Sequence, residues 1–270
     1  MKNPDAPILV IIVPCYNEEE VFPETARRLS EKITRLVSGK IVSPKSSLLF
    51  IDDGSADNTW GLIESRHREN RVFGGIRLSK NYGHQNALLC GLLFAGDYAD
   101  LAISIDADLQ DDVDAIDKMI SCYLSGDEIV LGVRSGREED SFFKRASAAF
   151  FYGLMCFLGA DLVPNHADFR LMGREAIRTL EEKTKTNTFL RGIVPHLGYE
   201  TGAVYYSRKK RMAGKSKYTL RSMLKFALGG ILSAGITGNF LGRIFRQTKN
   251  RPEYKIEKVL FSPEIKNEVR

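Results

Sequence analysis

The chain has 270 residues, of which 43% are hydrophobic and 27% charged, so it is long and apolar enough to bury a sizeable core. Its net charge of +5 is modest, and its four cysteines are far apart with no C-x-x-C pair, which excludes a zinc site and a disulfide framework. We therefore expect one large α/β domain in a reducing, cytosolic setting, with no secretory signal at its amino end.

Short apolar runs that end in polar loops alternate with helical patterns over the first half of the chain. This alternation is typical of β-α-β units, so we expect a mainly parallel central sheet flanked by helices. The runs that predict strands are Ile8–Val13, Leu48–Ile51, Ile76–Leu78, Leu101–Ile105 and Ile129–Val133.

The clearest helix follows the first predicted strand. Its apolar residues recur at three- and four-residue steps, which predicts one face packed on the sheet, whereas the other face, including Lys32, is polar. The apolar positions are Phe22, Ala26, Leu29, Ile33 and Leu36.

Other helical patterns follow in chain order. A helix through Trp60 has Asp57 as its expected N-cap. Further helices are predicted at His84–Ala95, Asp114–Ser125 and Phe142–Leu158, and we interpret the last, which is densely apolar, as a core helix rather than a membrane-facing one.

The last third of the chain is first basic and then apolar. Residues 205–225 carry eight Lys and Arg and no acidic residue, a pattern that suits anionic lipid headgroups, a substrate phosphate or nucleic acid. No recognised nucleic-acid motif accompanies the charge, so we expect no nucleic-acid partner. The glycine-rich apolar run Phe226–Gly242 is short for a bilayer span and is expected to lie on a membrane or pack on the domain. Residues from Arg246 onward predict a polar tail or a short helix.

Three polar loops follow predicted strands, at Pro14–Glu18, Asp52–Thr59 and Asp106–Gln110. In an α/β sheet, ligands bind where the carboxyl ends of strands meet the loops. We therefore expect the three loops to converge on one edge of the sheet and to form the site.

The third loop is a candidate metal site. Asp106 and Asp108 are one residue apart, so on an extended strand end they point the same way and either share a divalent cation or divide its ligands with ribose hydroxyls. Gln110 continues this face, and Mg²⁺ or Mn²⁺ there would neutralise the charge of a departing diphosphate. In the alternative interpretation, the tripeptide only starts the following helix, with Asp111 and Asp112 at its amino end.

The second loop holds more carboxylates than a helix cap needs. Asp52 and Asp53 are surplus to the cap, and a carboxylate that accepts from the imide N–H of uracil would explain one of them. Tyr16, in the first loop, is either a stacking partner for a base or an ordinary packing residue.

Six motifs occur in a fixed order along the chain: Val13–Glu18, Ile51–Thr59, Ser79–Ala87, Asp106–Gln110, Asp168–Met172 and Arg208–Tyr218. Together they resemble glycosyltransferase family 2 and, more narrowly, its polyprenyl-phosphate glycosyltransferases, the dolichol-phosphate mannose synthases and bactoprenol glucosyltransferases.

The resemblance implies a GT-A (Rossmann-like) catalytic domain over residues 1–222 and an inverting transfer of a hexose, glucose from UDP-glucose, to a polyprenyl phosphate. It assigns the metal to Asp106, Asp108 and Gln110. The positions that match the family's nucleotide-sugar ligands are Pro14, Tyr16, Glu18, Asp53 and Asp106.

A phosphate acceptor suits the basic residues near the predicted site. A lipid phosphate is largely ionised at neutral pH, so it needs cations rather than a general base. Arg134 and Arg137 follow the last predicted strand and Arg170 lies in the D-F-R motif, so their guanidinium groups are expected to hold the phosphate. Asp168 is either a base or an orienter of Arg170, and the second role is favoured because the two side chains share one side of an extended segment.

Lys215 and Lys217 lie on a Gly-containing loop that is expected to close over the diphosphate. Relatives of this subgroup commonly continue with two long transmembrane helices, a hairpin that is expected to be missing here, which leaves residues 223–270 as a membrane-proximal extension. We expect the enzyme on the cytoplasmic face of the cell membrane. The sequence does not decide between a monomer and a homo-oligomer. The rival functions are transfer to a hydroxyl acceptor in polysaccharide synthesis and nucleotide binding without turnover.

Overall fold

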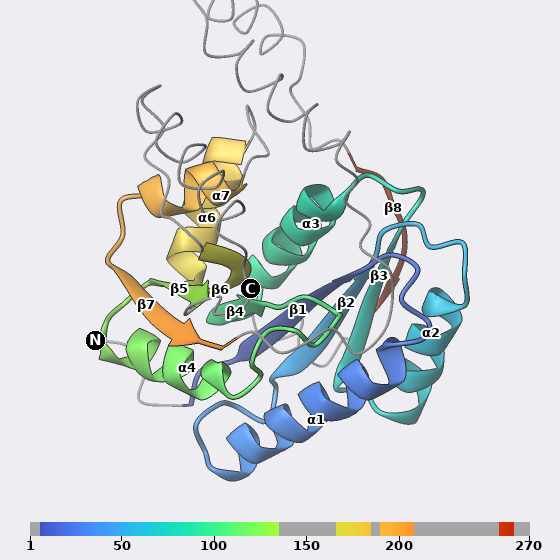
Figure 1. Ribbon diagram of the computed structural model, residues 1–270, viewed down its shortest axis with the longest axis horizontal. Helices are drawn as coiled ribbons and strands as arrows, with labels where there is room; N and C mark the ends of the chain where they lie inside the picture. Colours follow the sequence, from blue (N-terminus) through green and yellow to red (C-terminus); the bar gives the residue numbers. More distant parts are fainter. Residues whose placement is uncertain (1–5, 135–165, 185–189, 208–253, 262–270) are drawn as a thin grey trace, which may run out of the picture.

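The computed structural model describes residues 6–134, 166–184, 190–207 and 254–261, which form a central sheet with helices on both faces (Figure 1). Several predictions lie outside these residues, namely those for Arg137, Lys215, Lys217, the helix Phe142–Leu158 and the apolar run Phe226–Gly242. Within the described ranges, no helix is long and apolar enough to cross a bilayer.

Strands and helices alternate from β1 to β5 as the sequence predicts, whereas β6, β7 and β8 were not predicted. The strands are β1 (Leu9–Cys15), β2 (Ser47–Asp52), β3 (Phe73–Leu78), β4 (Leu101–Ser104), β5 (Ile129–Arg134), β6 (His166–Gly173), β7 (Thr201–Tyr206) and β8 (Ile256–Leu260). The helices are α1 (Phe22–Ser38), α2 (Thr59–Glu69), α3 (His84–Gly96), α4 (Ala115–Ser125), α6 (Arg174–Thr184) and α7 (Leu190–Ile193), followed by a 3₁₀ turn at Val194–His196.

The strands form one sheet in the order β7-β5-β6-β4-β1-β2-β3-β8. β1 pairs in parallel with β2 and β4, β2 pairs in parallel with β3, and β5 pairs in parallel with β7, whereas β6 and β8 are antiparallel to their neighbours. The expectation of an α/β fold with a mainly parallel sheet is confirmed. It follows that β1 to β5 and β7 all end at the same edge of the sheet.

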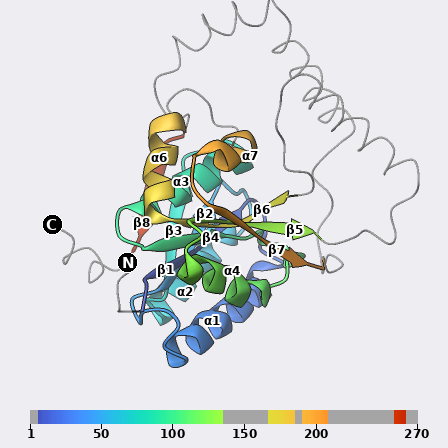
Figure 2. The ribbon, with the colours of Figure 1, turned by 90° about the vertical axis from the view of Figure 1, so that its left-hand side faces the viewer.

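Two apolar cores lie on the two faces of the sheet. Alternate residues of β1 point to opposite faces, so that Leu9 and Ile11 join the core under α1, α2 and α4, while Val10 and Ile12 join the core under α3, α6 and α7. Figure 2 shows the two groups of helices on either side of the sheet. This sandwich fixes the strand ends from which the site is built.

Helix α1 buries every apolar position that the periodicity predicts, but the prediction of an exposed Lys32 is wrong. The Lys32 side chain is 3% exposed, and its Nζ lies 2.7 Å from carboxylate oxygens of both Asp114 and Asp117. The reason is tertiary, because the start of α4 packs beside α1 and supplies two carboxylates that neutralise the buried ammonium.

The helix starts also differ from two expectations. α2 begins at Thr59 with Asn58 in the N-cap position, although Asp57 still accepts hydrogen bonds from the Thr59 N–H and hydroxyl at 3.0 and 2.6 Å. α4 begins only at Ala115, beyond Asp106 and Asp108, so the interpretation of the D-A-D tripeptide as a helix start is wrong.

The C-terminal residues 256–260 form β8, not a tail or a short helix. The strand pairs with β3 at the edge of the sheet, and its Lys258 Nζ lies 2.6 Å from the Glu64 carboxylate of α2. Phe261, directly after the strand, packs against Phe94 and Tyr98 at ring-centroid distances of 5.3 and 4.7 Å. Most side chains of β8 are exposed, so the sequence of the strand has no alternating apolar pattern by which it could be predicted. β8, which falls within the predicted extension, therefore belongs to the same sheet as β1 to β7.

Candidate active site

The carboxyl ends of β1, β2 and β4 bring the three polar loops together, as predicted. The Asp53 N–H donates to the Cys15 carbonyl at 2.8 Å, and the Ile105 N–H donates to the Ile12 carbonyl at 3.0 Å. The first two loops are also joined side chain to backbone, since the Asn17 N–H donates to Ser55 Oγ and the Glu18 N–H donates to Thr59 Oγ1, both at 2.9 Å.

The first loop carries three of the predicted donor ligands. Pro14 is buried within β1 opposite Ile51, whereas Tyr16 and Glu18 are half-buried just beyond the strand. Asn17 between them has a φ of 52°, in the left-handed region, so the chain turns sharply there. Tyr16 and Glu18 therefore lie at the carboxyl edge of the parallel strands.

Asp53 anchors the next loop. Its side chain is 3% exposed and accepts backbone N–H groups from Tyr82 at 2.7 Å and Gly83 at 2.9 Å. Burial raises the pKa of this carboxyl, and the two N–H donors oppose that rise. Gly54, with a φ of 65°, lets the loop after β2 pack closely against the backbone of Lys80, because a side chain at Gly54 would collide with that backbone. Asp53 thus holds the segment that leads into α3.

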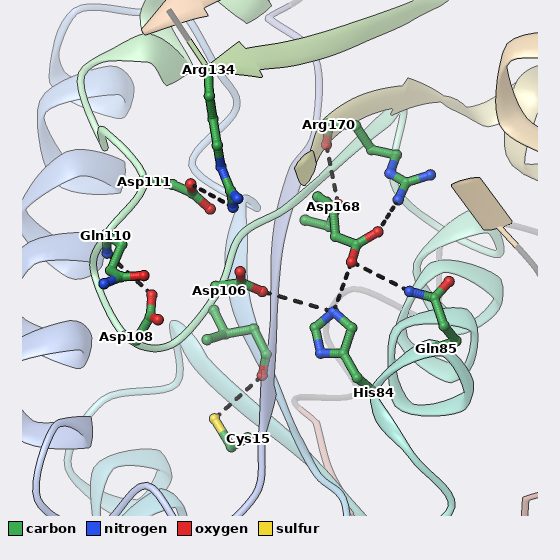
Figure 3. Close-up of polar contacts among 12 residues, drawn as sticks. Cys15, His84, Gln85, Asp106, Asp108, Gln110, Asp111, Arg134, Asp168 and Arg170 are labelled. Carbon is green, nitrogen blue, oxygen red and sulfur yellow. Dashed lines mark hydrogen bonds and ion pairs between the residues drawn. The ribbon is translucent and has the colours of Figure 1, made fainter. Parts of the chain in front are cut away.

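This segment delivers His84 to the centre of the site. His84 is the first residue of α3, and its Nε2 lies 3.3 Å from Asp168 Oδ2 and 3.8 Å from Asp106 Oδ1 (Figure 3). Gln85 donates from Nε2 to Asp168 Oδ2 at 3.3 Å. Neither residue was predicted individually as part of the site, although both lie in the motif Ser79–Ala87, because nothing local relates them to carboxylates elsewhere in the chain.

The loop after β4 turns earlier than predicted. β4 ends at Ser104, residues 107 and 108 form a turn, and Leu109 has a φ of 53°. Asp106 points toward His84 while Asp108 points toward Gln110, whose N–H donates to Asp108 Oδ1 at 3.2 Å (Figure 3). The premise of an extended strand end is wrong, because a strand cannot continue through this turn. Asp106, Asp108 and Gln110 nevertheless lie in one loop at the carboxyl edge of the parallel strands.

The chemistry of this loop fits a divalent cation. Burial raises the pKa of Asp106 to about 6, with further contributions from the carboxylates of Asp111, Asp168 and Asp108. A cation relieves such a concentration of negative charge, and hard oxygen donors suit Mg²⁺ and Mn²⁺. Within the described ranges, no three His, Cys, Asp or Glu side chains form a metal cage by themselves. Mg²⁺ commonly binds one or two carboxylates together with substrate phosphates, so the donor set still fits.

Asp168 and Arg170 meet on one side of β6, as predicted from the D-F-R motif. Arg170 Nη2 donates to Asp168 Oδ1 at 2.5 Å, and the Arg170 side chain is fully buried. The Ser104 hydroxyl donates to the Asp168 backbone carbonyl, which ties β6 to the end of β4. Asp168 is therefore contacted by Arg170, Gln85 and His84 at once.

Arg134 ends β5 and extends toward the same region, between Asp111 and the cluster of Asp106, His84 and Asp168 (Figure 3). Its Nη2 donates to Asp111 Oδ1 at 3.4 Å. The structure thus brings together every predicted site residue that it describes at one edge of the sheet, where carboxylates face guanidinium groups.

The fold is that of the GT-A glycosyltransferases, with polar loops at the carboxyl ends of parallel strands, where ligands bind in such sheets. Residues 10–181, more than half of the chain, match the family model described as Glycosyl transferase family 2. The chain belongs to glycosyl transferase family 2.

Curated relatives agree with this assignment, and a solved structure shares the fold. The chain is 50% identical to the uncharacterized glycosyltransferase YkoT of Bacillus subtilis over 230 residues, covering 85% of this chain and 68% of that protein. It is 33% identical to the bactoprenol glucosyl transferase of Shigella phage SfV over 227 residues, covering 83% and 70%. Glucosyl-3-phosphoglycerate synthase from Mycobacterium tuberculosis, solved with Mn²⁺, UDP-glucose and phosphoglyceric acid, superimposes with a TM-score of 0.53 at 18% identity, covering 84% and 79%.

Proposed function

We propose that the protein is an inverting hexosyltransferase that moves glucose from UDP-glucose to a polyprenyl phosphate. The observation that carries the proposal is the carboxylate cluster around Asp106 with the guanidinium groups of Arg134 and Arg170 beside it. A site of this kind can bind one phosphate group through a divalent cation held by the carboxylates. It can bind a second phosphate group through the neighbouring guanidinium groups. The name of the Shigella phage relative supports bactoprenol phosphate as the acceptor.

On the donor side, Asp106, Asp108 and Gln110 would hold Mg²⁺ or Mn²⁺. When bound, the ion neutralises charge that develops on the departing nucleoside diphosphate. Tyr16 would stack on the base, and Pro14, Glu18 and Asp53 would line the nucleoside pocket. Lys215 and Lys217 stay predicted ligands of the diphosphate.

On the acceptor side, Arg134 would bind the lipid phosphate, together with Arg137, while Arg170, which is buried against Asp168, stays a predicted ligand of the phosphate. A phosphate oxygen is already ionised at neutral pH, so it attacks the anomeric carbon without giving up a proton. The three contacts to Asp168, from Arg170, Gln85 and His84, favour its role as the orienter of Arg170 over that of a general base.

We further propose that the enzyme works at the cytoplasmic face of the cell membrane. The described chain leaves the sheet at Arg134 and Tyr206 and re-enters it at His166 and Ile256. The strand directions put all four points at the carboxyl edge of the parallel strands, the edge that carries Asp106 and Arg134. The basic stretch 205–225 is therefore attached at the edge where a lipid phosphate would arrive, which suits attraction to anionic headgroups.

An assay with purified protein, undecaprenyl phosphate and a panel of nucleotide sugars tests the proposal. We expect lipid-linked glucose from UDP-glucose, loss of transfer on addition of EDTA, and recovery with Mn²⁺ or Mg²⁺. Transfer to a hydroxyl-bearing sugar acceptor and none to undecaprenyl phosphate would overturn the proposed acceptor. Transfer that is unaffected by EDTA would overturn the assignment of Asp106, Asp108 and Gln110 to a metal.

A further inference from the structure

A cluster of three polar side chains joins the donor loop to β5 and β7. The Tyr206 hydroxyl donates to Asp111 Oδ1 at 2.5 Å and accepts a hydrogen bond from Arg134 Nε at 3.4 Å. Arg134 Nη2 donates to the same carboxylate oxygen at 3.4 Å. Asp111 directly follows Gln110 of the predicted metal loop, so these contacts connect both halves of the site.

The cluster is well suited to hold a fixed geometry. The Asp111 side chain is 1% exposed, and the Tyr206 ring packs edge-to-face on Phe169 at a centroid distance of 5.3 Å. Burial, with the Asp111 carboxylate nearby, raises the pKa of the Tyr206 phenol, so the hydroxyl stays protonated and donates at neutral pH. A change in the conformation of Arg134 would therefore remove one of the two hydrogen bonds to the buried Asp111 Oδ1.

The contacts occupy one particular edge of the guanidinium group. Nε and Nη2 form the lateral edge of an arginine fork, and they are the atoms that Tyr206 and Asp111 engage. The end of the fork, formed by Nη1 and the second N–H of Nη2, makes no hydrogen bond to the residues that the structure describes, and it is the remaining bidentate donor pair.

We propose that Tyr206 is a positioning residue that, with Asp111, locks Arg134 so that the end of its guanidinium fork receives the acceptor phosphate. This inference rests on the proposed function, since it deepens the role of Arg134 there. Because Asp111 belongs to the donor loop, the same contacts set the distance between the acceptor phosphate and the bound donor. Tyr206 acts through Arg134 and does not itself touch the substrate.

The test is Tyr206→Phe, which removes the hydroxyl and keeps the ring on Phe169. The KM for undecaprenyl phosphate should rise about tenfold, as expected for the loss of a hydrogen bond to a charged group, while the KM for UDP-glucose changes less than about twofold. Tyr123→Phe is the matched control, because the Tyr123 hydroxyl donates to the Asp100 carbonyl at 3.2 Å, at the opposite end of β4. It should lower the melting temperature to a similar extent and leave both KM values unchanged.

A double-mutant cycle separates positioning from general stability. In an Arg134→Ala background, Tyr206→Phe should have no further effect on the KM for undecaprenyl phosphate, because the side chain that it positions is gone. A full additive effect in that background, or a Tyr206→Phe enzyme with an unchanged acceptor KM, would overturn the inference while wild-type activity leaves the proposed function intact. A wild-type enzyme that is inactive on undecaprenyl phosphate would overturn both.

Discussion

Replacing Thr25 with valine tests whether helix α1 holds the turn that carries Asp106 and Asp108. Thr25 is fully buried, and its hydroxyl donates to the Ala107 carbonyl at 2.6 Å and lies 3.0 Å from the carbonyl of Val21, the N-cap residue of α1. Ala107 lies between the two aspartates and is 5% exposed. Valine keeps the shape of threonine but leaves this carbonyl without its donor.

The magnitude follows from the burial. An unsatisfied buried acceptor costs about 1–3 kcal/mol. For a domain of this size, a loss of about 1.5 kcal/mol corresponds to a fall in melting temperature of roughly 3–6 °C. A catalytic carboxylate displaced by a fraction of an ångström loses more in rate than in stability, so we expect kcat to fall by about tenfold to a hundredfold.

Calorimetry and steady-state kinetics on Thr25→Val and Thr25→Ser provide the comparison. Serine retains the hydroxyl, so its kcat should stay within about threefold of the wild-type value, although the lost methyl group lowers stability by about 1 kcal/mol. A Thr25→Val enzyme with wild-type kcat and melting temperature would refute the idea that α1 positions the turn. Equal losses of kcat in both variants would attribute the effect to packing instead.

Three other substitutions test separate parts of the site and fold. Asp108→Ala should lower transfer by more than about a hundredfold at saturating substrates, measured with radiolabelled UDP-glucose, and activity close to wild type would remove Asp108 from the site. Arg134→Ala should raise the KM for undecaprenyl phosphate at least about tenfold with little change in UDP-glucose binding by calorimetry, and equal losses for both substrates would contradict its acceptor role. Lys32→Met should lower the free energy of unfolding, measured in urea, by less than about 1 kcal/mol, because the side chains of Asp114 and Asp117 are 69% and 47% exposed and are hydrated once the lysine is gone. A larger loss would mean that the ion pairs stabilise the fold.

The layered fold was predictable because its signals are local. Buried strands such as β1 and β2 are continuous apolar runs, and the core face of α1 repeats every three or four residues. The edge strand β8 has mostly exposed side chains and two charged residues at its centre, so no such signal exists for it. Its place depends on contacts with residues far away in the chain.

The site was predictable only in part for the same reason. Strand order puts Asp53 and Asp106 at one edge because the carboxyl ends of parallel strands coincide there. His84, Asp111 and Tyr206 became visible only in three dimensions, since each contacts residues distant in sequence, as Tyr206 does with Asp111 across 95 positions. The prediction of an exposed Lys32 was wrong for the same reason, because the sequence of a polar helix face does not show that a neighbouring helix supplies the counter-charges that allow the lysine to be buried.

The proposed metal site at Asp106 and Asp108 can be tested by the anomalous diffraction of manganese in crystals of the protein grown with UDP and Mn²⁺. We expect a manganese peak within coordinating distance of a carboxylate of Asp106 or Asp108, with the UDP diphosphate on its other side. A manganese ion bound to UDP away from both carboxylates, or UDP bound away from the carboxyl edge of the sheet, would contradict it.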